Sequence, residues 1–131
     1  MGLAVRTGAW AKTENSYPDA TWIDGKYTTG GGIKIDQDWC ITQNLPVIPG
    51  KSYTIKWGDS AANGKYIEQL NIEGSYIRSG MQYNSNGERS YTFGSDVHFV
   101  RFSCLIANKT IAFLRNDTDG KFVLLNGKIM S

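Results

Sequence analysis

The side chains that could do chemistry in this chain are suited to ligand binding more than to catalysis. Aromatic rings can stack on the apolar face of a sugar, while amides, carboxylates and guanidinium groups bind its hydroxyls. Nine residues of these types are candidates for a binding site: Trp22, Tyr27, Asp59, Tyr66, Asn71, Tyr76, Arg78, Tyr83 and Arg101. Each aromatic has an alternative interpretation as core or turn packing, because a domain of this size needs large inward residues.

The most specific site prediction concerns Tyr76 and Arg78, which follow the Glu73-Gly74 turn signal. Alternate residues of a strand project to the same side, so these two side chains should lie next to each other. We expect them to line a sugar-facing surface together with Trp22 and Tyr27.

Groups that could act in catalysis are sparse. His98 is the only histidine, and hydrolysis by a serine or cysteine nucleophile needs a base beside that nucleophile. The 12 acidic residues show no paired arrangement of the kind that glycosidases use. We therefore expect no enzymatic activity and no catalytic residue.

Two acidic segments could hold a cation, and each has a simpler interpretation. The segment 116–120, NDTDG, is similar to the start of a calcium loop, but Asn126 stands where an EF-hand supplies its glutamate. A tight hairpin turn fits that segment better. Asp36 and Asp38 share a strand face and could help to hold a structural calcium, with a solvated strand edge as the preferred interpretation. We expect no cofactor.

Cys40 and Cys104 lie in the strand-like runs WCIT and RFSCLI. Small buried thiols are common in such runs, so we predict two free core cysteines. The alternative is a disulfide that links two sheets, which would require an oxidising compartment. The opening segment, MGLAVRTGAWAKTE, has no apolar core of a secretory signal and argues against that alternative.

The elements that must position these residues are predicted to be strands. The chain of 131 residues is long enough to bury a sizeable core. Its 15 glycines indicate many turns, and its 4 Trp, 7 Tyr and 5 Phe favour strands over helices. A net charge of +2 without a Lys/Arg run argues against nucleic acid as a partner. No stretch of about 18 apolar residues is present, so we expect no membrane insertion.

Runs rich in β-branched and aromatic residues alternate with turn signals, which is typical of a sandwich. We place strands at Lys34–Asp36, Trp39–Val47, Ser52–Trp57, Tyr66–Ile72, Ser75–Tyr83, Arg89–Phe93, His98–Ile106, Thr110–Arg115 and Phe122–Ile129. The turn signals are Gly58-Asp59, Asn63-Gly64, Glu73-Gly74, Asn86-Gly87, Asp119-Gly120 and Asn126-Gly127. Residues 1–33 are polar and Gly-rich and should form a partly irregular N-terminal arm. We predict a single all-β domain over residues 1–131, a jelly-roll-like antiparallel β-sandwich with no helix longer than two turns.

Alternation predicts which side chains face the core. Pro49-Gly50 suits a type II turn that leads into a strand. In that strand the inward set is Tyr53, Ile55 and Trp57. In the later strand we assign Val100, Phe102, Cys104 and Ile106 inward and Phe99, Arg101 and Ser103 outward. The segment Thr110–Leu125 is apolar on both faces, as in a central strand or at a contact between subunits.

Several motifs occur in a distinctive order: WIDGKY, GGGI, ITQNLPVIPGKSYTI, NIEGSYI, SYTF and HFVRFSC. This order resembles that of jelly-roll, carbohydrate-binding-like modules of bacteriophage tail and baseplate proteins and of related bacterial surface proteins. The likeness spans Trp22 to Cys104. Asn71 stands where the family pattern has Asp, FVR replaces Tyr-Ile-Arg, and the residues after Ala107 match no part of the pattern.

The resemblance implies a non-enzymatic module that binds a host polysaccharide or cell-surface glycan. Other virion proteins and further copies of the chain are the implied protein partners. The location implied is a virion assembled in the cytoplasm of a bacterial host, or else a bacterial cell surface. A purely structural virion protein, such as a capsid decoration, head-fibre or baseplate subunit that self-assembles, is the alternative, because fold does not imply function.

Overall fold

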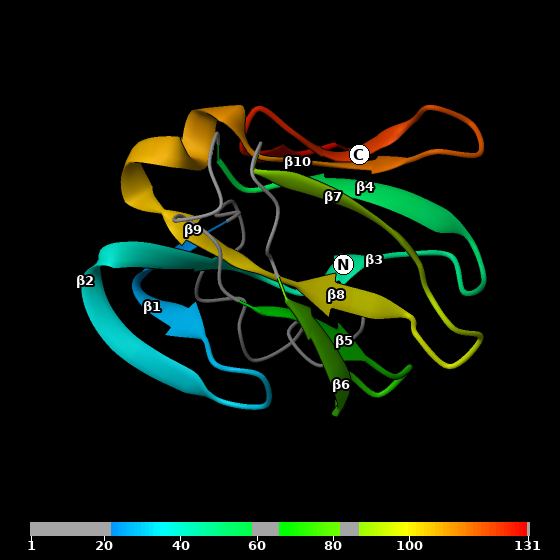
Figure 1. Cartoon of the computed structure of the whole chain (residues 1–131), viewed down its shortest axis with the longest axis horizontal. Helices are drawn as coiled ribbons and strands as arrows, with labels where there is room; N and C mark the ends of the chain where they lie inside the picture. Colours follow the sequence, from blue (N-terminus) through cyan, green and yellow to red (C-terminus); the bar gives the residue numbers. More distant parts are fainter. Residues whose placement is uncertain (1–21, 59–65, 82–86, 131) are drawn as a thin grey trace, which may run out of the picture.

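Strands dominate the computed structural model, which describes residues 22–58, 66–81 and 87–130 (Figure 1). The strands are β1 (Trp22–Thr28), β2 (Ile33–Thr42), β3 (Leu45–Pro46), β4 (Ser52–Lys56), β5 (Tyr66–Leu70), β6 (Tyr76–Met81), β7 (Glu88–Thr92), β8 (Phe99–Arg101), β9 (Ser103–Leu105), β10 (Phe113–Asn116), β11 (Phe122–Leu125) and β12 (Lys128–Ile129). A six-residue 3-10 helix, η4 (Ile106–Ile111), lies between β9 and β10. Within the described ranges no helix is long and apolar enough to cross a membrane.

The strands form two antiparallel layers, which confirms the predicted β-sandwich. The first, the β4 layer, is a five-stranded sheet in the order β12-β11-β10-β4-β7 and lies at the top of Figure 1. The second, the β5 layer, joins the sheets β1-β2-β9 and β3-β8-β5-β6, because β2 runs on into β3 and β8 into β9. A backbone hydrogen bond of 2.9 Å from the Thr42 nitrogen to the Phe102 oxygen spans the break between them. The chain crosses repeatedly between the layers, as in a jelly roll.

The core fills the space between the layers as the alternation predicts. Tyr53 and Ile55 on β4, and Trp57 directly after it, are at most 1% exposed. Val100, Phe102 and Cys104 are fully buried opposite them, and Ile106 is half-buried. Side chains on the other face of β5 and β8 therefore point away from the β4 layer.

Two aromatic residues make contacts between the layers. The Trp22 indole Nε1 of β1 donates to the Gly127 carbonyl in the β11–β12 turn at 3.1 Å. The Tyr91 ring of β7 lies against Gly80 of β6, where an added Cβ would stand 2.7 Å from the tyrosine hydroxyl. A side chain at position 80 would therefore require the Tyr91 ring to shift.

The predicted turns set the strand connections. Gly50 has φ 81°, and the Lys51 nitrogen donates to the Ile48 oxygen at 3.3 Å, which is the type II turn expected at Pro49-Gly50. It joins β3 to β4, strands of different layers. Asn126 and Gly127 have φ 51° and 79°, as a type I′ hairpin between β11 and β12 requires.

Three sequence predictions are wrong in detail. Residues 22–28 form the strand β1, where no strand was predicted, and residues 1–21 lie outside the described ranges. A register shift at Gly25, which has φ 87°, breaks the alternation that would have marked this strand. Thr110 belongs to η4, and the strand predicted from there begins at Phe113. Phe122–Ile129 is a hairpin of two strands.

The strand predicted at His98–Ile106 is broken at Phe102, where the chain passes from β8 to β9. Phe99 and Arg101 are half-buried on the outer face, as predicted. Ser103, predicted to face outward, is fully buried because its hydroxyl lies 2.8 Å from the Thr28 hydroxyl of β1. The end of the β1–β2 hairpin therefore folds back over the outer face of β9 and β5.

Candidate functional site

The fully buried carboxylate of Glu68 holds the turn between β1 and β2 in place, and several of the predicted site residues lie near this turn or the carboxylate. Glu68 of β5 has no exposed surface. Its Oε1 accepts from the Arg101 Nε at 2.7 Å, and its Oε2 accepts from the backbone nitrogens of Gly31 at 2.8 Å and Gly30 at 3.2 Å. A buried charge is costly unless it is paired and hydrogen-bonded. These donors therefore hold the β1–β2 turn against the outer face of β5 and β8.

Strand register explains why Glu68 and Arg101 meet. The two residues are directly opposite each other in the antiparallel pair of β5 and β8. Opposed residues project to the same face, and Val100 and Ile67, their neighbours in sequence, are buried in the core on the other face. The ion pair thus occupies the outer face, where the β1–β2 turn covers it.

Backbone conformation favours glycine at two positions of the turn, and the space beside each is tight. Gly30 and Gly31 have φ 84° and 121°, a region that other residues rarely adopt. An added Cβ at Gly30 would lie 3.4 Å from the Tyr66 ring, and one at Gly31 would lie 3.3 Å from the Tyr76 ring. Successive backbone N–H groups in a glycine turn form a concavity for an anion, and here Glu68 is that anion.

Two tyrosines border this turn and reach solvent. Tyr66 is half-buried, and Tyr76 is 42% exposed with its hydroxyl donating to the Ser79 hydroxyl at 3.1 Å. The Arg101 side chain remains 25% exposed beside Glu68. We call this set the Tyr76 surface: Gly30, Gly31, Tyr66, Tyr76, Ser79 and Arg101. It brings together three of the predicted site residues, Tyr66, Tyr76 and Arg101.

The expectation that Tyr76 and Arg78 lie side by side is wrong. The register between β5 and β6 shifts between Gln69 and Leu70, and this bulge breaks the alternation of β6. The Tyr76 hydroxyl donates a hydrogen bond to the Ser79 hydroxyl on the outer face of β6. Arg78 points to the other face, where its Nη1 donates to the Gln69 Oε1 at 3.4 Å.

Arg78 forms an exposed ion pair outside the Tyr76 surface. Its Nη2 and Nη1 donate to the two carboxylate oxygens of Asp96 at 2.7 and 3.2 Å. The hydrogen bond to Asp96 raises the pKa of Arg78, and the hydrogen bond from Arg78 lowers the pKa of Asp96. Because both groups are in solvent, this pair contributes little to stability.

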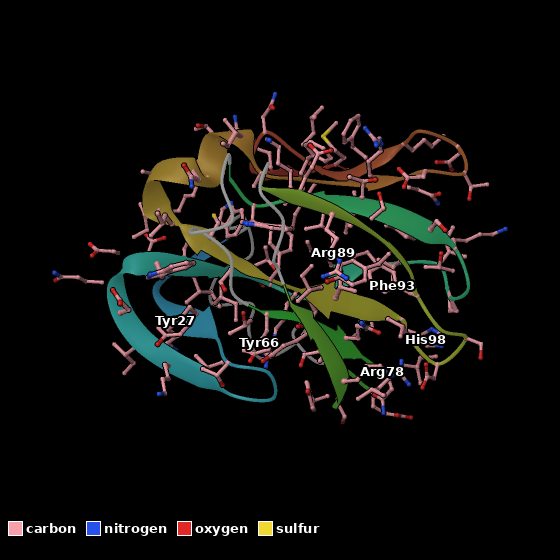
Figure 2. The ribbon with its side chains drawn as sticks, viewed as in Figure 1. Tyr27, Tyr66, Arg78, Arg89, Phe93 and His98 are labelled. Carbon is pink, nitrogen blue, oxygen red and sulfur yellow. The ribbon has the colours of Figure 1, made fainter. Side chains whose placement is uncertain are left out.

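Trp22 and Tyr27 pack on the rings of other residues. Trp22 is buried with its ring edge on Phe102, at a centroid distance of 5.8 Å. Tyr27 is half-buried, and its ring lies 5.7 Å from that of Trp39. Figure 2 labels Tyr27, Tyr66 and Arg78, which come from β1, β5 and β6.

The remaining candidates do not join the site either. The Asn71 Oδ1 accepts from the Glu73 and Ser75 nitrogens at 3.0 and 2.9 Å, so this side chain builds the β5–β6 turn. Asp59 and Tyr83 lie outside the described residues.

In both acidic segments that could hold a cation, a side-chain oxygen accepts a hydrogen bond from a nearby backbone nitrogen. The Asn116 Oδ1 accepts from the Thr118 nitrogen and the Asp119 Oδ1 from the Lys121 nitrogen, both at 2.8 Å, which gives the predicted tight hairpin. The Asp36 Oδ1 accepts from the Asp38 nitrogen at 2.9 Å. Across residues 22–58, 66–81 and 87–130, no three or more His, Cys, Asp or Glu side chains form a group that could hold a metal ion.

Cys40 and Cys104 are free and buried, which confirms the predicted thiols. They are partners on neighbouring strands β2 and β9 of one layer. The alternative of a disulfide between the two sheets is therefore wrong, because any bond between them would stay within the β5 layer. The hydrogen bond with Cys40 and burial raise the pKa of the Cys104 thiol.

Sequence reasoning missed Glu68 and Ser79 as parts of this surface. A signal for Glu68 was present, since a single acid stands in the run YIEQL and a single arginine in the run FVRF. Opposite charges inside two otherwise apolar strands need each other as partners if the strands are buried. Ser79 gave no such signal.

Comparisons of the chain with protein-family models, curated proteins and solved structures find no match. The likeness to phage and bacterial surface modules therefore stays a prediction.

Proposed function

We propose that the chain is a non-enzymatic module that binds a polysaccharide through the Tyr76 surface. The observation that carries the proposal is the 42% exposure of Tyr76 at the Gly30-Gly31 turn. Tyr66 also borders this turn, and Arg101 pairs with the Glu68 carboxylate that holds it. An exposed aromatic face can stack on a sugar ring, and a neighbouring guanidinium and hydroxyl can bind its hydroxyls.

Rigid support favours binding at this surface. The turn under both tyrosines is held by Glu68, whose carboxylate receives two backbone N–H groups and the Arg101 Nε. Side chains that are already fixed lose less conformational entropy when a ligand binds. The surface can therefore gain affinity from few contacts.

The same carboxylate is unsuited to catalysis. A glycosidase acid must give up a proton to the leaving oxygen, and a second carboxylate must face it across a cleft. Glu68 is buried and its oxygens are occupied by three donors. A structural role for Glu68 supports a binding module over a hydrolase.

The site of action that we propose follows from the resemblance. It is the tail, fibre or baseplate of a phage virion assembled in the cytoplasm of a bacterial host, or else a bacterial cell surface. The ligand would then be a host polysaccharide.

A glycan and cell-wall binding screen with two matched variants tests the proposal. We expect wild type to bind at least one polysaccharide and Tyr76→Ala to bind it at least about tenfold more weakly, a loss of about 1.4 kcal/mol. Tyr76→Phe keeps the ring and loses only the hydroxyl bond to Ser79, so it should retain most of the affinity. Failure of wild type to bind any polysaccharide, or equal binding by Tyr76→Ala, would refute the proposal.

A purely structural virion role is the second candidate, and exposed isoleucines favour it. Ile35 and Ile33 on β2 are 86% and 44% exposed on the β1–β2 hairpin. Exposed apolar side chains grouped on one element are typical of protein contacts. Size-exclusion chromatography with light scattering separates the candidates: a trimer or larger assembly that Ile35→Lys dissociates supports assembly, and a monomer supports a free-standing binding module.

A further inference from the structure

The two cysteines face each other across one strand pair. Cys40 of β2 and Cys104 of β9 are direct partners in the antiparallel register. Their sulfur atoms lie 3.7 Å apart, and the Cys40 Sγ also lies 3.3 Å from the Cys104 carbonyl oxygen. The sulfurs are therefore in van der Waals contact in the folded protein.

The backbone at this position fits the geometry of a disulfide. Directly opposed residues in an antiparallel pair have Cα atoms about 4.5–5.5 Å apart. A disulfide accepts Cα separations of about 4.4–6.8 Å. The remaining approach of the two sulfurs can come from side-chain rotation, so the ladder of β2 and β9 need not move.

The wide separation of the two cysteines in the sequence means that a disulfide between them would stabilise the fold. Cys40 and Cys104 are separated by 64 residues. A cross-link that closes a long loop removes much conformational entropy from the unfolded chain. It would also fix β2 to β9, the pair at which the two sheets of the β5 layer join.

We propose that Cys40 and Cys104 form a reversible cross-strand disulfide when the chain meets a low-molecular-weight disulfide such as oxidised glutathione. The thiolate of one cysteine attacks the oxidant, forms a mixed disulfide and releases one glutathione thiolate. The thiolate of the second cysteine attacks the protein sulfur of that mixed disulfide and releases the second glutathione. The protein loses two protons and two electrons, and the oxidant takes up the electrons as two thiols.

Because the two thiols are buried, the exchange with oxidised glutathione can occur only when they become accessible. Both side chains are 0% exposed, so the oxidant reaches them during folding or when β9 opens locally. The folded dithiol is the form of a reducing compartment, and the cross-linked form is the form of an oxidising one. This inference depends on the geometry of β2 and β9 and not on the proposed glycan binding.

Refolding in a glutathione buffer tests the proposal at equilibrium. Wild-type protein is refolded from denaturant in mixtures of reduced and oxidised glutathione, quenched with acid, and examined by thiol titration and intact mass. In the oxidising mixture we expect no free thiol, a mass lower by two hydrogens and no attached glutathione. We expect two free thiols in the reducing mixture, and a thermal midpoint about 10 °C higher for the oxidised form.

Single-cysteine variants provide the control. Cys40→Ala and Cys104→Ala should show the same thermal midpoint in both mixtures, because neither can close the loop. Two free thiols or stable glutathione adducts on folded wild type in the oxidising mixture would overturn the proposal. So would an oxidised form that melts below the reduced form. These readouts use wild type alone, so they decide the question even if a variant fails to fold.

Discussion

Replacing Arg101 with alanine tests the arrangement that supports the candidate site. In the folded protein the Arg101 Nε donates at 2.7 Å to Glu68, which has no exposed surface. Arg101→Ala removes the cation and leaves the carboxylate buried with the backbone nitrogens of Gly30 and Gly31 as its remaining donors. The unfolded chain is unaffected, because there the carboxylate is solvated.

The size of the effect follows from this environment. Breaking a buried ion pair by removing one partner costs about 3–5 kcal/mol. Two hydrogen bonds to Oε2 remain, and the arginine is 25% exposed, so water can reach the vacated position. We therefore expect a loss near the lower limit, about 3 kcal/mol, which is a large part of the roughly 5–15 kcal/mol of a typical domain.

Urea unfolding of four proteins measures this loss: wild type, Arg101→Ala, Glu68→Gln and the double variant. Glutamine keeps an acceptor for the glycine nitrogens and carries no charge, so Arg101→Ala should cost less in the Glu68→Gln background. Arg78→Ala is the matched control, since it breaks an exposed arginine–carboxylate pair and should change the midpoint far less. A loss below about 0.5 kcal/mol for Arg101→Ala, the range of ordinary surface changes, would refute the reasoning.

Three further predictions concern other parts of the fold. Gly80→Ala should cost about 1–3 kcal/mol in urea unfolding, because its Cβ would stand 2.7 Å from the Tyr91 hydroxyl; a neutral change would contradict that packing. Gly127→Ala should lower the thermal midpoint strongly, because its φ is 79° and its Cβ would overlap the Lys109 carbonyl, and an unchanged midpoint would contradict the turn geometry. The pKa of Asp96, followed by carboxyl NMR, should lie below its usual 3.8 in wild type and rise in Arg78→Ala. Because the folded pKa is the lower one, the pair stabilises above pH 3.8 and loses its effect as the pH falls through the folded pKa; equal pKa values in both proteins would contradict this.

Much of the fold was predictable because local chemistry sets it. Pro49-Gly50 and Asn126-Gly127 require particular φ values, and alternation places Tyr53 and Ile55 in the core. The strand β1 was missed because the bulge at Gly25 shifts its alternation. The alternation of apolar and polar residues predicts which way side chains point in a regular strand, and this prediction fails where a bulge interrupts the strand.

The candidate site was predictable only in part. The types of Tyr66, Tyr76 and Arg101 marked them as candidates, but their convergence depends on a fold-back of the β1–β2 turn over β5. That contact joins Gly30 to Glu68, 38 residues apart, and Glu68 to Arg101, 33 residues apart. Contacts between residues so far apart in the sequence cannot be predicted from the pattern of neighbouring residues. The bulge in β6 likewise sends Arg78 to the opposite face from Tyr76.

The most direct test of the proposed function is to map a bound glycan on the protein. A polysaccharide fragment from the binding screen is titrated into isotopically labelled protein, and backbone amide shifts are followed by NMR. We predict that the largest shifts occur at Gly30, Gly31, Tyr76 and Ser79, with saturation as the fragment is added. Shifts centred on another part of the molecule, or no saturable shifts with any fragment, would contradict the proposal that the Tyr76 surface binds glycan.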